Sequence, residues 1–154
     1  MSDACTIYIK RVDYQAIYDE VASLAQVPVE VSGFKDDWQS LTVTQQSTIT
    51  FNSMRQNPGT FDEFSELILG TYSFFRKIET SDEDRKNAVL MDISQCQFAI
   101  GIGGFPEFNE AEGHYDMIFA VAKALNGCIF NGSGMIDEEG LMLLNSDGTF
   151  DEGS

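Results

Sequence analysis

The sequence predicts a mixed α/β domain, in which a single-layer mixed sheet is packed by three to four helices. Segments rich in β-branched and aromatic residues alternate with segments whose apolar residues recur at helical spacing. Towards the C-terminus, two apolar strand segments flank a helical one, which is the order of a βαβ-like unit. A chain of 154 residues that is 43% hydrophobic can build its own core, so we expect residues 1–154 to form one globular domain.

The first third of the chain predicts strands and one helix. Residues 6–12 are rich in β-forming residues, and Asp13 is a suitable N-cap for a helix after them. The apolar residues of that helix recur at Tyr14, Ile17, Val21 and Leu24. Residues 27–31 favour a short strand, which its proline places at a sheet edge, and residues 32–37 favour a loop. Alternating residues on both sides of Gln45-Gln46 then predict a β-hairpin, with the apolar positions at Leu41, Val43, Ile49 and Phe51.

Two helices are expected in the middle of the chain. A turn over residues 57–59 precedes the first, which Thr60 and Glu63 begin as a capping box. Its apolar stripe is typical of a helix that faces a core, and consists of Phe61, Phe64, Ile68, Tyr72 and Phe75. The second helix begins between Ser81 and Asp84 and runs to about residue 94. Its apolar face is expected to hold Ala88, Leu90 and Met91.

The βαβ-like unit lies between residues 98 and 130. Phe98–Ile102 is continuously apolar, which favours a central strand that is covered on both faces. Asn109 and Glu112 have the spacing of a capping box, and Gly127 suits the end of the helix that they begin. Cys128–Phe130 then predicts a second buried strand.

A terminal hairpin and a tail are expected after this unit. Met135-Ile136 and Leu141–Leu144 flank the acidic turn Asp137–Gly140. The residues from about 145 to 154 are polar, so we expect a tail that frays.

Negative charge is concentrated in the second half of the chain. The net charge is −16, and residues 87–154 contribute −10 of it, because they hold eleven acidic residues and only one base, Lys123. Such a charge repels nucleic acid and anionic membrane surfaces, and it favours cationic partners. We therefore expect a basic protein partner, and neither nucleic acid nor a membrane.

Carboxylates surround two aromatic residues after the first strand of the βαβ-like unit. The helix dipole explains single acids such as Glu110 and Glu112, but it does not explain why bases are missing from the whole segment. An apolar anchor with a rim of carboxylates suits a cationic protein partner. The expected partner-binding residues are Phe105, Glu107, Phe108, Glu110, Glu112, Asp116, Asp137, Glu138 and Glu139.

Two motifs typical of cofactor or metal sites are incomplete. Gly101–Gly104 follows a strand, but Pro106 stands where a dinucleotide loop needs its third glycine, so we expect these glycines to allow a tight turn. His114 is the only histidine, and Glu110 could join it on a metal, yet no third ligand has suitable spacing. We expect His114 to be half-buried and held by Glu110, on the face of its helix that carries Ile118, Val121 and Leu125. No catalytic residue, metal or cofactor is therefore expected.

The cysteines and the apolar stretches indicate where the protein resides. Cys5, Cys96 and Cys128 are odd in number and lack metal-site spacing, which favours a reducing compartment. The N-terminus does not have the apolar core of a secretory signal, and no apolar stretch is long enough to span a bilayer. We expect a cytoplasmic protein.

In its size, its acidity, the α/β layout of residues 98–130 and its lack of catalytic machinery, the chain resembles the small acidic immunity proteins that bacteria pair with toxins. The resemblance implies binding to a cognate basic toxin, for example a nuclease, and blocking of that toxin. Two alternatives remain open. One is a small enzyme or ligand-binding domain with a pocket near Gly101–Gly104 and His114, and the other is a phage-type mimic of nucleic acid. The sequence leaves the oligomeric state open.

Overall fold

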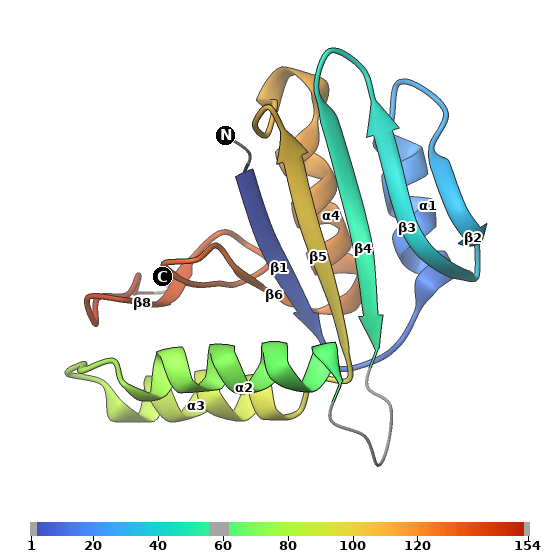
Figure 1. Cartoon of the computed structure of the whole chain (residues 1–154). Helices are drawn as coiled ribbons and strands as arrows, with labels where there is room; N and C mark the ends of the chain where they lie inside the picture. Colours follow the sequence, from blue (N-terminus) through green and yellow to red (C-terminus); the bar gives the residue numbers. More distant parts are fainter. Residues whose placement is uncertain (1–2, 56–61, 153–154) are drawn as a thin grey trace.

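The computed structural model describes residues 3–55 and 62–152. The strands in these residues are β1 (Asp3–Ile9), β2 (Glu30–Phe34), β3 (Asp37–Thr44), β4 (Thr48–Arg55), β5 (Phe98–Phe105), β6 (Cys128–Phe130), β7 (Gly134–Ile136) and β8 (Met142–Asn145). The helices are α1 (Tyr14–Leu24), α2 (Glu63–Arg76), α3 (Glu83–Ser94) and α4 (His114–Leu125), with a short 3-10 helix, η1 (Glu110–Glu112), before α4. All these strands join one sheet, in the order β2-β3-β4-β5-β1-β6-β7-β8 (Figure 1).

The mixed α/β class is confirmed, but the expectation of a mixed sheet is wrong. Every neighbouring pair of described strands is antiparallel. The cause is the position of β1, which lies between β5 and β6 and pairs antiparallel with both. β5 and β6 therefore run in the same direction, and α4 connects them. The βαβ-like unit is present, with β1 inserted between its two strands.

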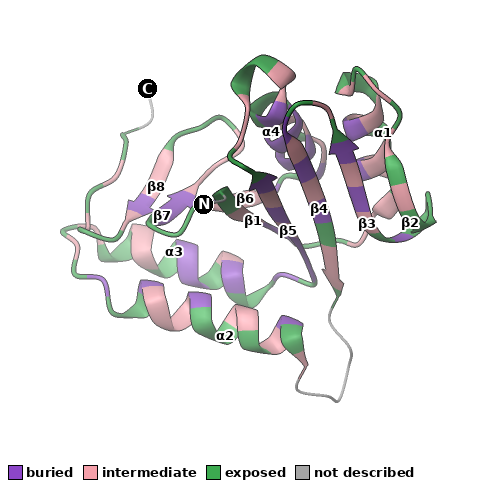
Figure 2. Ribbon diagram, turned by 45° about the horizontal axis from the view of Figure 1, so that its top comes forward, coloured by how far each residue is buried: buried purple, intermediate pink, exposed green. Residues whose placement is uncertain are grey.

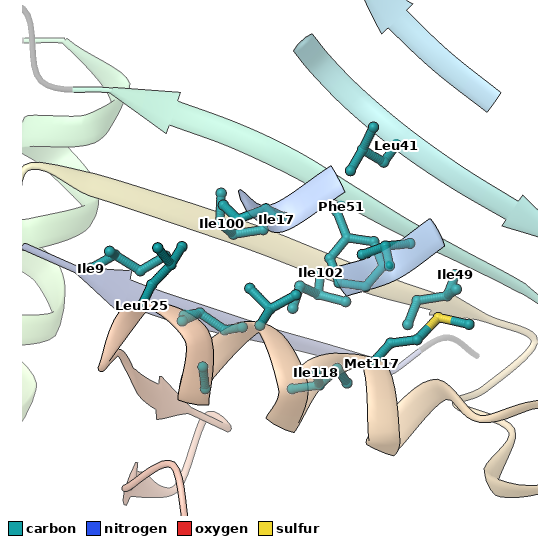
Figure 3. Close-up of a cluster of buried hydrophobic side chains, with 14 of the residues drawn as sticks. Ile9, Ile17, Leu41, Ile49, Phe51, Ile100, Ile102, Met117, Ile118 and Leu125 are labelled. Atoms are coloured by element: carbon teal, nitrogen blue, oxygen red, sulfur yellow. The ribbon is translucent and has the colours of Figure 1, made fainter. Parts of the chain in front are cut away.

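One face of the sheet packs against α1 and α4, which lie side by side (Figure 1). The helices contribute residues at helical spacing, such as Ile17 and Val21 from α1. Figure 3 shows Met117 of α4 beside Ile49 and Leu125 beside Ile9, and Ile118 belongs to the same core. The predicted inward face of α1 is confirmed at Ile17 and Val21, whereas Leu24 is exposed.

The other face of the sheet packs against α2 and α3 and forms a second, smaller core. Phe75 of α2 and Ile93 of α3 are fully buried there, together with Tyr8 of β1. Because β1 and β5 lie between the two cores, β5 is buried on both faces over Phe98–Ile100, the first part of the run for which the sequence predicted it (Figure 2). The inward residues of α3 are Val89, Leu90 and Ile93. The expectation of Ala88 and Met91 on this face is therefore wrong.

Three of the α-helices begin at an aspartate whose side chain accepts a hydrogen bond from the third backbone N–H beyond it. Asp13 does so for α1, Asp62 for α2 and Asp82 for α3. The expected cap at Asp13 is confirmed. The turn at 57–59, and Thr60 of the expected capping box, lie outside the described residues, as does Phe61 of the expected stripe.

The expected loop at 32–37 and the expected tail from residue 145 are both more ordered than the sequence predicted. Residues 32–37 hold the end of β2, a two-residue turn and the start of β3, so the expected loop is a hairpin instead. The polar residues 145–152 fold back rather than fraying. Asn145 and Thr149 are joined by a backbone hydrogen bond, Asp151 N–H donates to the Met142 carbonyl, and the Arg85 guanidinium lies 4.2 Å from the centre of the Phe150 ring.

No helix among the described residues combines the length and the apolar character needed to cross a membrane.

We expect two phenylalanines to differ sharply in their contribution to stability. Phe51 is 0% exposed in the larger core and Phe34 is 75% exposed at the edge strand. Phe51→Ala should lower the free energy of unfolding by about 3–5 kcal/mol, whereas Phe34→Ala should change it by less than about 0.5 kcal/mol. Urea titrations that follow the fluorescence of Trp38, the only tryptophan, measure both values. Similar losses in the two variants would contradict this arrangement of the core.

Candidate functional site

The acidic residues of the candidate site gather at one end of the sheet. β1 begins, β5 ends and α4 begins at this end, as Figure 1 shows at its upper edge. We call the charged residues there the acidic pole: Asp3, Glu107, Glu110, Glu112 and Asp116. Glu112 is largely buried, while the side chains of the other four are exposed.

The bases of the protein lie away from the acidic pole. Lys10 and Arg11 follow β1, Lys35 follows β2, Arg55 ends β4, and Lys123 lies in the last turn of α4. Each of these positions is at the opposite end of the sheet, because the strands and helices alternate in direction. The other four bases, Arg76, Lys77, Arg85 and Lys86, belong to α2, α3 or the residue after α2. Several are already paired with carboxylates, at 2.8 Å for Lys10 and Asp92 and 2.7 Å for Arg11 and Asp13.

The nine expected partner-binding residues fall into two groups. Phe105, Glu107, Phe108, Glu110, Glu112 and Asp116 lie together in and around the connection from β5 to α4. The structure does not place Asp137, Glu138 and Glu139 with them. These three connect β7 to β8, and the first two line a separate hollow together with Lys10 and Asn126. This hollow is at the far end of β1 and α4, about 20 Å away by the length of β1.

An open groove of about 360 Å³ runs beside the acidic pole. We call it the aromatic groove. Its walls are the rings of Phe108, Tyr115 and Phe119 and the side chains of Ile118, Ile129 and Ile136, and its polar residues are Asp3, Cys5 and Asn131. The Phe108 and Tyr115 rings meet edge to face, with their centres 5.7 Å apart. Outside the groove, Phe105 is 66% exposed at the end of β5.

Phe108 is held in place by two residues of neighbouring strands. The Phe108 N–H donates a hydrogen bond to Oδ2 of Asp3 at 2.9 Å. The Phe108 ring lies against Gly104, where an added Cβ would come within 2.9 Å of the ring carbon Cε1 and of the Phe108 nitrogen. Gly101–Gly104 is a continuous part of β5, so the expectation that these glycines form a tight turn is wrong. The glycine at 104 instead makes room for an aromatic ring.

A buried network fixes the connection between β5 and α4. The Asn109 N–H donates to Nδ1 of His114 at 2.9 Å, and the Asn109 side chain donates to Oγ of Ser47 at 3.3 Å. Oε1 of Glu112 accepts the Ser47 N–H at 3.0 Å and lies 3.9 Å from Nε2 of His114. These bonds tie the acidic pole to the turn between β3 and β4. Glu112, and not Glu110, lies next to the His114 ring, and Glu110 is exposed. The expectation that Glu110 holds His114 is therefore wrong.

His114 is a structural residue of this network. It is 1% exposed, rather than half-buried as expected, and it shares the buried face of α4 with Ile118, Val121 and Leu125, as predicted. Burial lowers the pKa of His114, and the nearby Glu112 opposes this effect. The ring is therefore neutral near pH 7, with its Nδ1 free of a proton and accepting from Asn109.

Two of the cysteines lie far from His114. Cys96 and Cys128 lie at the far end of the sheet, and burial raises the pKa of each thiol to about 12. Within the described parts of the chain, no three His, Cys, Asp or Glu side chains are grouped so that they could hold a metal ion.

Comparisons of the chain with protein-family models, with curated proteins and with solved structures find no match. The functional argument for this protein therefore rests on the geometry and charge of the acidic pole and the aromatic groove.

Two glycines of β5 give a matched test of how Phe108 is seated. Gly104→Ala should lower the free energy of unfolding by about 1–3 kcal/mol, because its Cβ would displace the Phe108 ring. Gly101→Ala is the control, since its Cβ would meet Met54 Cε at an ordinary 3.5 Å. Thermal and urea unfolding of both variants measure the difference. Equal stability of the two variants would contradict the contact.

The lowered pKa of His114 predicts a stability that depends on pH. An unfolded histidine titrates near pH 6.5, so the unfolded chain binds a proton there while the folded protein resists it. The wild type should lose stability as the pH falls from about 7.5 towards 5.5, and His114→Gln, which removes the only histidine, should lose less. Urea titrations at both pH values give the two differences. Parallel pH profiles would show that His114 is not held in its neutral form.

Proposed function

We propose that this protein is a non-catalytic, acidic inhibitor that binds a basic protein partner through the acidic pole. The most specific form of the proposal is an immunity protein that neutralises a basic toxin by covering its functional surface. The observation that carries the proposal is the separation of charge, because the segments that form the pole contain five carboxylates and no lysine or arginine. A surface used only for solubility would usually intersperse both signs.

The pole has the chemistry of a protein-binding surface. Glu107, Glu110 and Asp116 are exposed around aromatic residues that remain accessible, with Phe105 66% and Tyr115 43% exposed. Aromatic anchors supply most of the binding energy of an interface when a polar rim excludes water around them. Carboxylates without counter-charges attract a basic partner over about 8–10 Å at physiological salt and speed its approach.

The charge favours a protein partner whose own surface is basic. A net charge of −16 repels nucleic acid, yet it matches the lysine- and arginine-lined grooves with which nucleases hold phosphates. Carboxylates of the pole would occupy such a groove in place of nucleic acid. The alternative of an enzyme or ligand-binding domain required a pocket at Gly101–Gly104 and His114. These glycines lie within β5 and the histidine is buried, so no observation favours that alternative.

Charge reversal at the acidic pole should abolish partner capture. A triple variant, Glu107→Lys, Glu110→Lys and Asp116→Lys, changes only exposed residues and leaves the structural Glu112 in place. Immobilised wild type should retain a basic protein from its native host at about 50 mM salt and release it at high salt. The association rate of the purified partner should fall at least about tenfold for the triple variant. Biosensor kinetics at low and physiological salt measure this change.

A control triple variant separates local from overall charge. Glu63→Lys, Glu66→Lys and Glu83→Lys change the net charge by the same amount, at exposed acids in the first turns of α2 and α3. The association rate should change much less for this control. Equal losses in both triple variants would mean that only the net charge matters, and binding unchanged by reversal of the pole would refute the proposed function.

A further inference from the structure

We propose that the aromatic groove receives an arginine side chain of the basic partner, an inference that rests on the proposed function. The groove opens beside the acidic pole, and its volume of about 360 Å³ is large enough to hold a long side chain. Its lining comes from the start of β1, the connection from β5 to α4, the first two turns of α4, and β6 and β7 with the residues between them. None of its lining residues is a base.

The walls of the groove suit the stem and the flat head of an arginine. Phe108, Tyr115 and Phe119 offer ring surfaces, and Ile118 and Ile129 complete an apolar lining. A guanidinium group stacks on aromatic rings, and its three methylene groups bury well against apolar side chains. The edge-to-face contact between Phe108 and Tyr115 holds two of these rings in fixed positions before any partner arrives.

Asp3 supplies a negative charge with which an arginine can pair. Its Oδ2 is fixed by the hydrogen bond from the Phe108 N–H at 2.9 Å, which sets the carboxylate at the wall of the groove. Its other oxygen takes part in no hydrogen bond among the described residues, and no lysine or arginine of those residues pairs with it. The side chain is exposed, so this oxygen can accept from a partner. Asp116, next to Tyr115, adds to the negative potential at this end of the sheet.

Arginine fits these features better than the other anchors that interfaces use. Leucine or phenylalanine would fill the apolar lining but would leave the Asp3 carboxylate next to an apolar group. Lysine would match the charge, but its ammonium is compact and strongly hydrated, and it cannot lie flat on two rings. The planar guanidinium can bond a carboxylate and stack at the same time. The groove thus specifies both the charge and the shape of the anchor.

A small probe tests the groove without the partner. The wild-type protein, labelled with ¹⁵N, is titrated with N-acetylarginine amide and, at matched ionic strength, with the neutral N-acetylcitrulline amide. We expect saturable amide shifts centred on Cys5, Tyr115 and Asn131. The arginine probe should bind at least about fivefold more tightly than citrulline. Equal affinity for both probes, or shifts spread evenly over the exposed carboxylates, would overturn the proposal.

Asp3→Asn provides the decisive variant. Its side-chain oxygen can still accept from the Phe108 N–H, so the groove keeps its shape while the charge is removed. The preference for arginine over citrulline should vanish in this variant and persist in the control Asp36→Asn, which neutralises an exposed carboxylate in the turn after β2. A preference that survives in Asp3→Asn would overturn the role of Asp3. N-Acetylleucine amide binding as tightly as the arginine probe would instead identify a purely apolar pocket and overturn the proposal.

The two proposals fail in different ways. If reversal of Glu107, Glu110 and Asp116 leaves partner capture unchanged, the proposed function fails, whatever the groove binds. If that reversal abolishes capture but Asp3→Asn leaves both the partner's affinity and the probe preference unchanged, only the arginine pocket fails. Loss of probe preference together with an about fivefold or greater loss of partner affinity in Asp3→Asn would support both.

Discussion

The antiparallel pairing of β1 with both β5 and β6 is the constraint on which the rest of the structure depends. It places Ile7, Tyr8 and Ile9 between the two cores, where all three are buried. It separates the two strands that α4 connects, so that this helix must cross over β1. The same pairing brings Asp3 opposite Gly104, and thereby to the connection between β5 and α4. The aromatic groove exists because the start of β1 meets the connection from β5 to α4 and the first turns of α4, although more than 90 residues separate β1 from the other two segments.

Strand direction also explains the distribution of charge. In an antiparallel sheet, the residues after one strand and those before its neighbour lie at the same end. Lys10 and Lys35 follow strands that run away from the acidic pole, Arg55 ends another such strand, and Lys123 lies in the last turn of the helix that begins at the pole. Glu112 has a different role from the exposed carboxylates, since it binds Ser47 within the network that fixes the connection. The pole therefore combines a rigid support with exposed carboxylates.

The parts of the fold that depend on neighbouring residues could be predicted from the sequence. The cap at Asp13, the hairpin around Gln45-Gln46 and the order of β5, α4 and β6 all follow from local patterns. The insertion of β1 could not be predicted, because its partner strands lie far along the chain. An apolar strand pattern does not indicate which strands will pair. That one pairing changed the expected mixed sheet into an antiparallel one. It also determines which charges are neighbours, so the sequence pattern groups the carboxylates of 137–139 with the pole although the fold separates them. Asp3 could not be predicted as a site residue for the same reason, because only the pairing of β1 with β5 brings it opposite Gly104.

The central claim is that the fold concentrates negative potential at one end of the sheet. Paramagnetic relaxation of backbone amides by two nitroxide probes of matched size, one cationic and one anionic, measures that potential residue by residue. The ratio of the cationic to the anionic effect should be largest at the amides of Glu107, Glu110 and Asp116. It should decrease steadily towards Lys10, Lys35 and Lys123. A ratio that is uniform over the surface would show that the acidity is a general property of the chain, and would contradict the existence of an acidic pole.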